Sequence, residues 1–133
     1  MTRRQASLLC LLALAACAKP KGAQGLAEAF IDHYYIERDH TAALGLAQGI
    51  AATRVAEERK LVEEARGAGA DTSQVQPHLY YAWKRTVPKG SDIEFTYLLT
   101  IDSGGVPLKK EVRVVVTPGA QGMRVSFFNE SDL

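Results

Sequence analysis

The sequence predicts an α+β domain in which two helices pack on the apolar face of a curved, four-stranded antiparallel sheet. Three observations predict it. Apolar residues follow a helical period from residue 25 to residue 66. From residue 78 onward they alternate with polar residues, as in strands with one buried face. Short segments rich in Gly, Pro, Asp and Ser separate these alternating runs and are typical of turns.

The first expected helix covers residues 25–38, where Leu26, Phe30 and Tyr34 recur at every fourth position. Asp39 is a good N-cap for a second helix, with Thr41 as the alternative cap, and we expect this helix over about residues 40–66. Its apolar side consists of Leu44, Ala47, Ala51, Val55 and Val62. Two glycines four residues apart, at 45 and 49, indicate close packing of another element or a kink. Oppositely charged pairs four residues apart mark a solvated face: Arg54/Glu58, Arg59/Glu63 and Lys60/Glu64.

Strands are expected over residues 78–87, 93–102, 108–117 and 123–128. Apolar residues occupy alternate positions in each, which predicts one face against the helices and one face toward solvent. In the last strand this alternation assigns Met123, Val125 and Phe127 to the buried face, so we expect Phe128 to be exposed. We expect Tyr80 to be exposed for the same reason, because the apolar positions of the first strand flank it.

Three segments carry a family resemblance. They are the helix with paired aromatics at 27–35 (Ala-Glu-Ala-Phe-Ile-Asp-His-Tyr-Tyr), the break Arg-Asp-His at 38–40 followed by Ala-Ala-Leu at 42–44, and the last strand at 122–130 (Gly-Met-Arg-Val-Ser-Phe-Phe-Asn-Glu). Together they resemble the nuclear-transport-factor-2-like superfamily over roughly residues 25–130. The resemblance implies a cone-shaped sheet around a helical layer. It also implies that a homodimer, with two chains paired through the open sheet face, is one possible assembly. The alternative is a cystatin-like fold, with one long helix in a wrapped sheet.

The N-terminal segment predicts where the protein is held. Arg3 and Arg4 precede an uncharged apolar run at residues 6–16. Eleven helical residues span only roughly 16 Å, about half of a bilayer core, so this run is a signal sequence and not a membrane span. The run ends in Leu-Ala-Ala-Cys at 14–17, which resembles a bacterial lipobox. The resemblance implies cleavage after Ala16 and acylation of Cys17; the alternative is an ordinary secretory signal with Cys17 left free.

Residues 17–24 form the expected lipidated cysteine and a polar tether to a domain at 25–133. Such a tether reaches at most roughly 25 Å, which keeps the domain close to the membrane. The resemblance implies the outer membrane, facing the periplasm, if the cell is Gram-negative, because residue 18 is Ala and not Asp. A short reach favours a partner or ligand at the same membrane.

Composition excludes several function classes. Removing residues 1–16 takes away two arginines and no acid, which leaves 14 basic and 15 acidic side chains. Without a basic excess, a nucleic-acid partner is not expected. Cys17 is then the remaining cysteine, and the three histidines are scattered, so we expect no thiol nucleophile, no metal site and no cofactor.

Ionisable residues of the first helix do not predict a catalytic set. Asp32, His33, Tyr34 and Tyr35 are consecutive, and successive helical residues point about 100° apart, so all four cannot line one pocket. Aromatic residues either fill the core or form a ligand or partner surface. The candidate contact residues are Tyr34, Tyr80, Trp83, Tyr97 and Phe128.

The preferred interpretation is a non-catalytic, membrane-anchored binding or accessory subunit of an envelope protein or complex. A second interpretation is binding of an apolar or aromatic small molecule in a cavity lined by Tyr34, Trp83 and Tyr97. A third is an enzyme of the dehydratase or isomerase kind, which requires an ionisable residue buried in that cavity.

Overall fold

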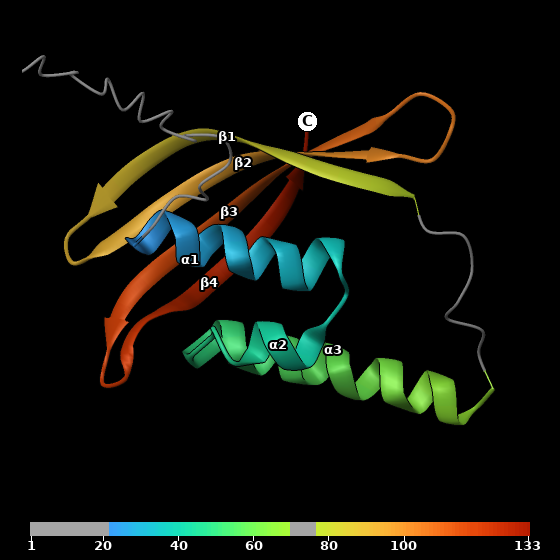
Figure 1. Ribbon diagram of the computed structural model, residues 1–133, viewed down its shortest axis with the longest axis horizontal. Helices are drawn as coiled ribbons and strands as arrows, with labels where there is room; N and C mark the ends of the chain where they lie inside the picture. The colour runs from blue at the N-terminus through green and yellow to red at the C-terminus, as the bar shows by residue number, and fades with distance from the viewer. Residues whose placement is uncertain (1–21, 70–76) are drawn as a thin grey trace, which may run out of the picture.

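The computed structural model describes residues 22–69 and 77–133, and Figure 1 shows their arrangement. The helical elements are α1 (Gly22–Ile31), the π-helix η1 (Asp32–Ile36), α2 (His40–Leu44) and α3 (Gly49–Gly67). The strands are β1 (His78–Lys89), β2 (Asp92–Asp102), β3 (Leu108–Gly119) and β4 (Gly122–Asp132). The predicted signal sequence, Cys17 and the first part of the predicted tether lie outside the described residues.

The four strands form one antiparallel sheet in the order β1-β2-β3-β4, as the alternating sequence predicts. The inner face of this curved sheet holds the helices (Figure 1). Helix α1 packs against β2, β3 and β4, and α3 packs against β4. The α+β architecture expected from the sequence is therefore confirmed, with several helices in place of the one long helix of the alternative fold.

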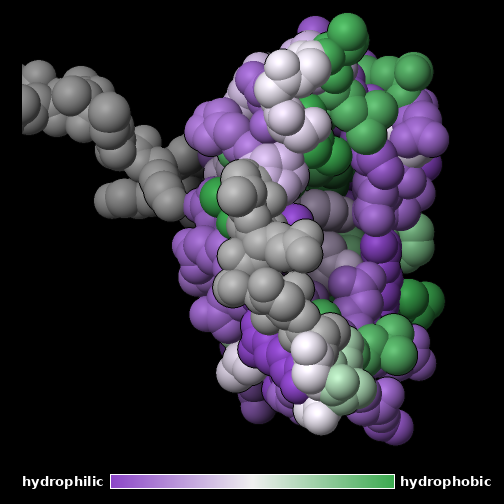
Figure 2. Space-filling model, turned by 90° about the vertical axis from the view of Figure 1, so that its right-hand side faces the viewer, coloured by the Kyte–Doolittle hydropathy of each residue, from purple (hydrophilic) through white to green (hydrophobic). Residues whose placement is uncertain are grey.

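The core lies between α1 and the inner face of the sheet. Its largest fully buried side chains include Phe30 and Ile31 of α1, Tyr97 and Leu99 of β2, and Val55 of α3. These residues lie far apart in the sequence. Burying their apolar surface stabilises the fold by about 25 cal/mol for each Å² removed from water. The surface that Figure 2 presents is mixed instead, with apolar residues standing between hydrophilic ones.

The expected first helix differs from the observed one at both ends. Helix α1 begins at Gly22, so residues 22–24 of the predicted tether are helical. From Asp32 the helix widens into a π-turn, in which the Glu37 N–H donates to the carbonyl oxygen of Asp32 at 2.8 Å. π-turns are rare and occur frequently at functional sites.

The expected second helix is divided into α2 and α3. The connecting residues 45–48 dock on β4: the Val125 N–H donates to the Leu46 carbonyl, and the Gln48 N–H donates to the Val125 carbonyl, each at 2.8 Å. Gly49 then starts α3 with a φ of 58°, which glycine adopts without strain. The glycine pair at 45 and 49 predicted either close packing of another element or a kink. The structure has the kink, and it lies where the linker docks on the sheet.

The prediction that Phe128 is exposed is wrong. A β-bulge shifts the β3–β4 register between Val115 and Val116, so Phe127 pairs with Val115 while Val125 pairs with Val116. The extra residue, Ser126, reverses the alternation in the rest of β4. Phe128 is consequently 2% exposed in the core, and Phe127 is 41% exposed on the outer face.

Among the helices of residues 22–69 and 77–133, none combines the length and the apolarity needed to cross a membrane.

Candidate functional site

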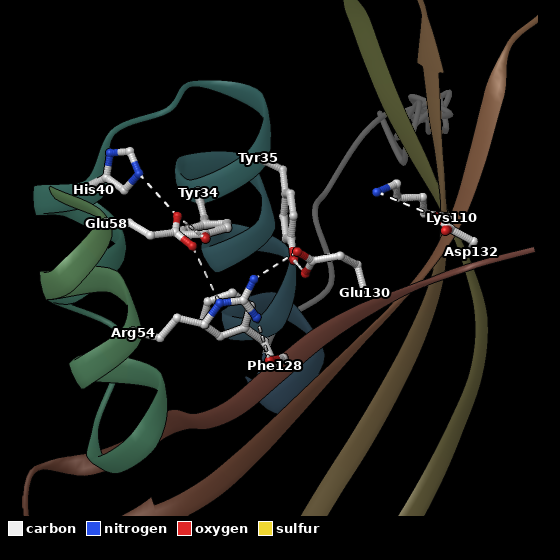
Figure 3. Close-up of polar contacts among 9 residues, drawn as sticks. All are labelled: Tyr34, Tyr35, His40, Arg54, Glu58, Lys110, Phe128, Glu130 and Asp132. Carbon is white, nitrogen blue, oxygen red and sulfur yellow. Dashed lines mark hydrogen bonds and ion pairs between the residues drawn. The ribbon is translucent and has the colours of Figure 1, made fainter. Parts of the chain in front are cut away.

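The most connected group of polar side chains lies between the helices and β4, and Figure 3 shows it. We call it the Arg54 cluster; it comprises Tyr34, Tyr35, Arg54, Glu58 and Glu130. Arg54, on α3, is at its centre: its Nη2 donates to Glu130 Oε1 at 2.8 Å, and its Nε lies 3.5 Å from Glu58 Oε1. The cluster therefore links two helices to the last strand.

Arg54 also contacts β4 through its guanidinium nitrogens and its flat face. Its Nη1 donates to the Phe128 carbonyl at 3.0 Å. Its Cζ lies 4.2 Å from the centre of the Phe128 ring, within the range of a cation–π interaction. Burial opposes the charge of this guanidinium, but the hydrogen bond to Glu130 and the Glu130 charge outweigh it, so the pKa of Arg54 is raised.

The two tyrosines of the π-turn enter the cluster together. The Tyr34 hydroxyl donates to Glu58, and the Tyr35 hydroxyl donates to Glu130 Oε2 at 2.5 Å. Their rings meet edge to face at 4.7 Å. Burial, followed by the hydrogen bonds to these carboxylates, raises the pKa of both Tyr34 and Tyr35. Both hydroxyls are thus protonated donors, and their protons are already committed to carboxylates.

A second polar group joins α1 and η1 to β1 and β2. The Tyr97 hydroxyl donates to Glu28 at 3.3 Å, and the Tyr81 hydroxyl donates to Asp32 at 2.8 Å. Burial is again the largest cause that raises the pKa of each tyrosine, with the charge and hydrogen bond of its carboxylate partner adding to it. Trp83, further along β1, is 53% exposed, and its Nε1 donates to the Thr86 hydroxyl at 2.9 Å.

The four consecutive residues of the first helix diverge, as their spacing predicts. Asp32 faces β1, and His33 Nδ1 lies 2.9 Å from Glu37 on the helix surface. Tyr34 stacks on Phe30, with ring centres 5.6 Å apart. The predicted trio of cavity-lining aromatics is divided as well: Tyr34 belongs to the Arg54 cluster, Tyr97 is 0% exposed beside Tyr81, and Trp83 is half exposed.

The outer face of the sheet carries the remaining predicted contact residue, Tyr80, which is 49% exposed. Phe127, which the alternation had assigned to the core, is exposed on the same face. Charged pairs lie between the aromatics: Lys84 Nζ and Arg85 Nη2 lie 3.0 and 2.9 Å from Glu111. The hydrogen bond from Lys84, and the charges of both bases, hold the pKa of Glu111 below its ordinary value.

Two oxygen atoms on this outer face have no hydrogen-bond partner among the described residues. They are Thr96 Oγ1 and Asn129 Oδ1, both buried. Register places them on either side of Arg113, because Thr96 pairs with Arg113 and Arg113 pairs with Asn129. Unsatisfied buried polar atoms are uncommon in folded proteins, so this row is a distinctive feature of the face.

The sequence indicated part of the Arg54 cluster. The four-residue spacing of Arg54 and Glu58 predicts their pair as part of a solvated face, whereas in the fold Arg54 also bonds to Glu130 of β4. Glu130 lies beyond the strand expected at residues 123–128, and only the longer β4 with its bulge brings it to Arg54. Among residues 22–69 and 77–133, no three His, Cys, Asp or Glu side chains gather as metal ligands would.

No protein-family model matches the chain, and no curated protein matches it. A solved structure from Thiobacillus denitrificans does match; it is described as a candidate calcium/calmodulin-dependent protein kinase type II association domain. The two share 12% sequence identity with a TM-score of 0.60, over 89% of this chain and 99% of that one. The chain has the nuclear-transport-factor-2-like fold. The resemblance noted in the three segments of sequence is thus confirmed at the level of the fold, and at this identity the match says nothing of function.

Proposed function

We propose that this nuclear-transport-factor-2-like domain is a lipid-anchored, non-catalytic binding subunit that docks on an envelope protein through the outer face of its sheet. The sequence supports the anchor, because the lipobox ending at Cys17 follows a short apolar signal run. Two or more acyl chains on Cys17 hold a protein stably at a membrane. The membrane then presents the domain to partners within reach of a short tether.

The observation that carries the docking surface is the pair of exposed aromatics on the outer face, Tyr80 and Phe127. Aromatic residues are enriched in the centres of protein interfaces, where they contribute large contact areas. Arg113 lies between them on β3 with no ion pair to any described residue, beside the unsatisfied oxygens of Thr96 and Asn129. A partner that presents an apolar pocket and a carboxylate is complementary to this face.

The Arg54 cluster fits a binding domain. Each of its tyrosine hydroxyls is held by a carboxylate, and each carboxylate also faces Arg54. Burial raises the pKa values of the two tyrosine hydroxyls further above neutrality, so neither hydroxyl exchanges its proton readily near neutral pH. We therefore assign the cluster the role of holding the helical layer on β4.

A second candidate function, binding of an aromatic or apolar small molecule, is supported by Trp83 alone. This residue lies on β1, which contacts η1 but no other helix, and it is half exposed. Because it is the one tryptophan of the chain, its fluorescence reports on that site directly. A panel of hydrophobic ligands that leaves the emission unchanged contradicts this candidate.

The test of the docking function uses a photo-crosslinking amino acid placed at position 80 or 127 of the full-length protein in its native membranes. We expect one stoichiometric envelope protein to be captured from both positions. The matched control is position 61 on α3, where Leu61 is a comparably exposed apolar residue (63%) on the helical side. Equal capture from position 61, or capture from none of them, contradicts docking through the sheet.

The anchor is tested separately by Cys17→Ala. We expect the variant to lose its acyl mass and its membrane fraction, and with them the crosslink. A variant that keeps its membrane fraction contradicts lipidation at Cys17 while leaving the docking face to be judged by the crosslinks.

A further inference from the structure

A small polar pocket lies between the turn that joins η1 to α2 and the C-terminal half of α3. Its volume is about 130 Å³. Arg38, His40 and Thr41 line it on one side, and Arg59, Glu63 and Arg66 line it from α3. Positions 59, 63 and 66 share one face of that helix, so the pocket is built by two regular elements. It is separate from the outer face of the sheet.

Three arginines and two acidic residues, Asp39 and Glu63, line this pocket. Asp39 is already engaged as the N-cap of α2, where its Oδ1 accepts a hydrogen bond from the Ala42 N–H at 3.0 Å. The Arg59–Glu63 pair expected from the sequence does not form within 4.0 Å, although Arg54–Glu58 and Lys60–Glu64 do. The side chains of Arg38 and Arg59 have no hydrogen bond or ion pair with another described residue.

Arg38 has an unusual backbone. Its φ of 54° makes it the one non-glycine residue in the left-handed region within the part of the chain described here. This conformation is strained for residues with a Cβ atom, and such residues cluster at functional sites. Glycine would close the turn without strain, so the arginine side chain at this position is present at an energetic cost to the fold.

We propose that this pocket binds a phosphoryl group. Guanidinium groups pair with phosphate oxygens through two parallel hydrogen bonds, and Arg38 and Arg59 approach the pocket from opposite sides. Thr41 also lines the pocket, and its side chain carries a neutral hydroxyl donor. The volume of the pocket equals that of about four water molecules, which suits one tetrahedral anion and not a large ligand.

The phosphoryl group could belong to a soluble phosphorylated molecule or to a lipid headgroup. If Cys17 is the anchor, the membrane lies near the start of α1, and Figure 1 shows the η1–α2 turn at the opposite end of that helix. The fifteen residues of α1 and η1 extend for roughly 22 Å. This placement favours a soluble phosphorylated molecule over a lipid headgroup. The choice between these two sources rests on the proposed anchor, whereas the phosphoryl site itself does not.

The test is a calorimetric titration of the full-length chain, in nonionic detergent, with inorganic phosphate at constant ionic strength. We expect saturable binding with one site per chain. Arg38→Gly and Arg59→Gln each remove charge-assisted hydrogen bonds, and each should weaken binding about tenfold or more. Glu63→Gln removes a repelling charge and should strengthen it. Arg38→Gly also relieves the left-handed strain, so its melting temperature should equal or exceed that of the wild type, which separates lost binding from lost folding.

The matched control is Arg113→Gln, which makes the same charge change on the outer face of the sheet. Binding should be unaffected by it. A second arm measures binding to phosphatidylglycerol vesicles against phosphatidylcholine vesicles. Vesicle binding that depends on Arg59, without saturation by inorganic phosphate, assigns the phosphoryl group to a lipid headgroup. Failure of both arms, or an equal loss in Arg113→Gln, overturns the proposal.

Discussion

Two phenylalanines that are neighbours on β4, Phe127 and Phe128, have opposite environments. The Phe128 ring packs on Phe30 and Tyr34 at 4.8 Å from each and lies under the guanidinium of Arg54. Phe127 points the other way, toward the exposed outer face. Hydrophobicity by itself does not separate the two, because one bulge residue decides which of them enters the core.

Truncation of these two residues should therefore have unequal effects. We expect Phe128→Ala to lower the free energy of unfolding by about 3–5 kcal/mol, because it leaves a cavity between α1 and β4. Phe127→Ala, the matched control, should cost about 1 kcal/mol or less, since its side chain is partly in water already. Denaturant unfolding of both variants measures the difference, and the reverse order would show that the strand is paired without the bulge.

At the scale of elements, the boundary between α2 and α3 is set by contact with β4 and not by helix propensity. The linker between them extends the sheet by one isolated bridge, between Ala47 and Val125. Gly45 retains an ordinary helical φ of −62°, whereas Gly49 has the left-handed φ of 58°. The two glycines look equivalent in the sequence, but only Gly49 occupies a position that requires glycine.

Alanine substitution distinguishes these glycines. Gly49→Ala should lower stability by about 1–2 kcal/mol, because the left-handed conformation brings the added Cβ close to the carbonyl oxygen. Gly45→Ala should change it by about 0.5 kcal/mol or less, since its Cβ would meet the nearest atom, the Ala42 oxygen, at 3.4 Å. Thermal and denaturant unfolding give both values. Similar costs at 45 and 49 would contradict the observed break between α2 and α3.

At the scale of the whole molecule, tyrosine hydroxyls bind the helical layer to its surroundings at two places. Tyr34 and Tyr35 hold η1 to α3 and β4, while Tyr81 and Tyr97 hold β1 and β2 to the first helix. Each of the four hydroxyls donates to a carboxylate, and each has a raised pKa in the folded protein, with burial as its largest cause. Overall stability is thus linked to the protonation of these groups.

This linkage predicts loss of stability in alkali. Below the unfolded tyrosine pKa, about 10, both states hold the phenolic protons and the full contribution is present. Above it the unfolded chain releases protons that the folded chain retains, so stability falls by at most about 1.4 kcal/mol per pH unit for each such tyrosine, and by less where solvent screens the hydroxyl. Tyr35→Phe should make this fall less steep.

The control for the alkaline measurement is Tyr80→Phe, because Tyr80 is exposed on the outer face and donates to no described carboxylate. Denaturant unfolding from pH 8 to pH 11 gives the slope for each protein. Equal slopes for the wild type and Tyr35→Phe would show that the buried hydroxyl is not retained as a donor.

Local patterns in the sequence were sufficient for the class of the fold and for the order of its elements. Alternation with period two predicted all the strands of the sheet, and the turns between them predicted an antiparallel meander, because both depend on residues close together in the chain. Asp39 was identified as a cap for the same reason, since its hydrogen bond reaches only to Ala42.

Tertiary structure alone decided which residues meet. The bulge at Ser126, the break before Gly49 and the π-turn at Asp32 each cost local regularity, and each is stabilised by contacts with residues remote in sequence. The Arg54–Glu130 pair joins residues 76 positions apart, a separation on which no periodic pattern reports. Strand and helix periods are properties of a short segment, whereas the side chains that complete a site are chosen by packing between segments.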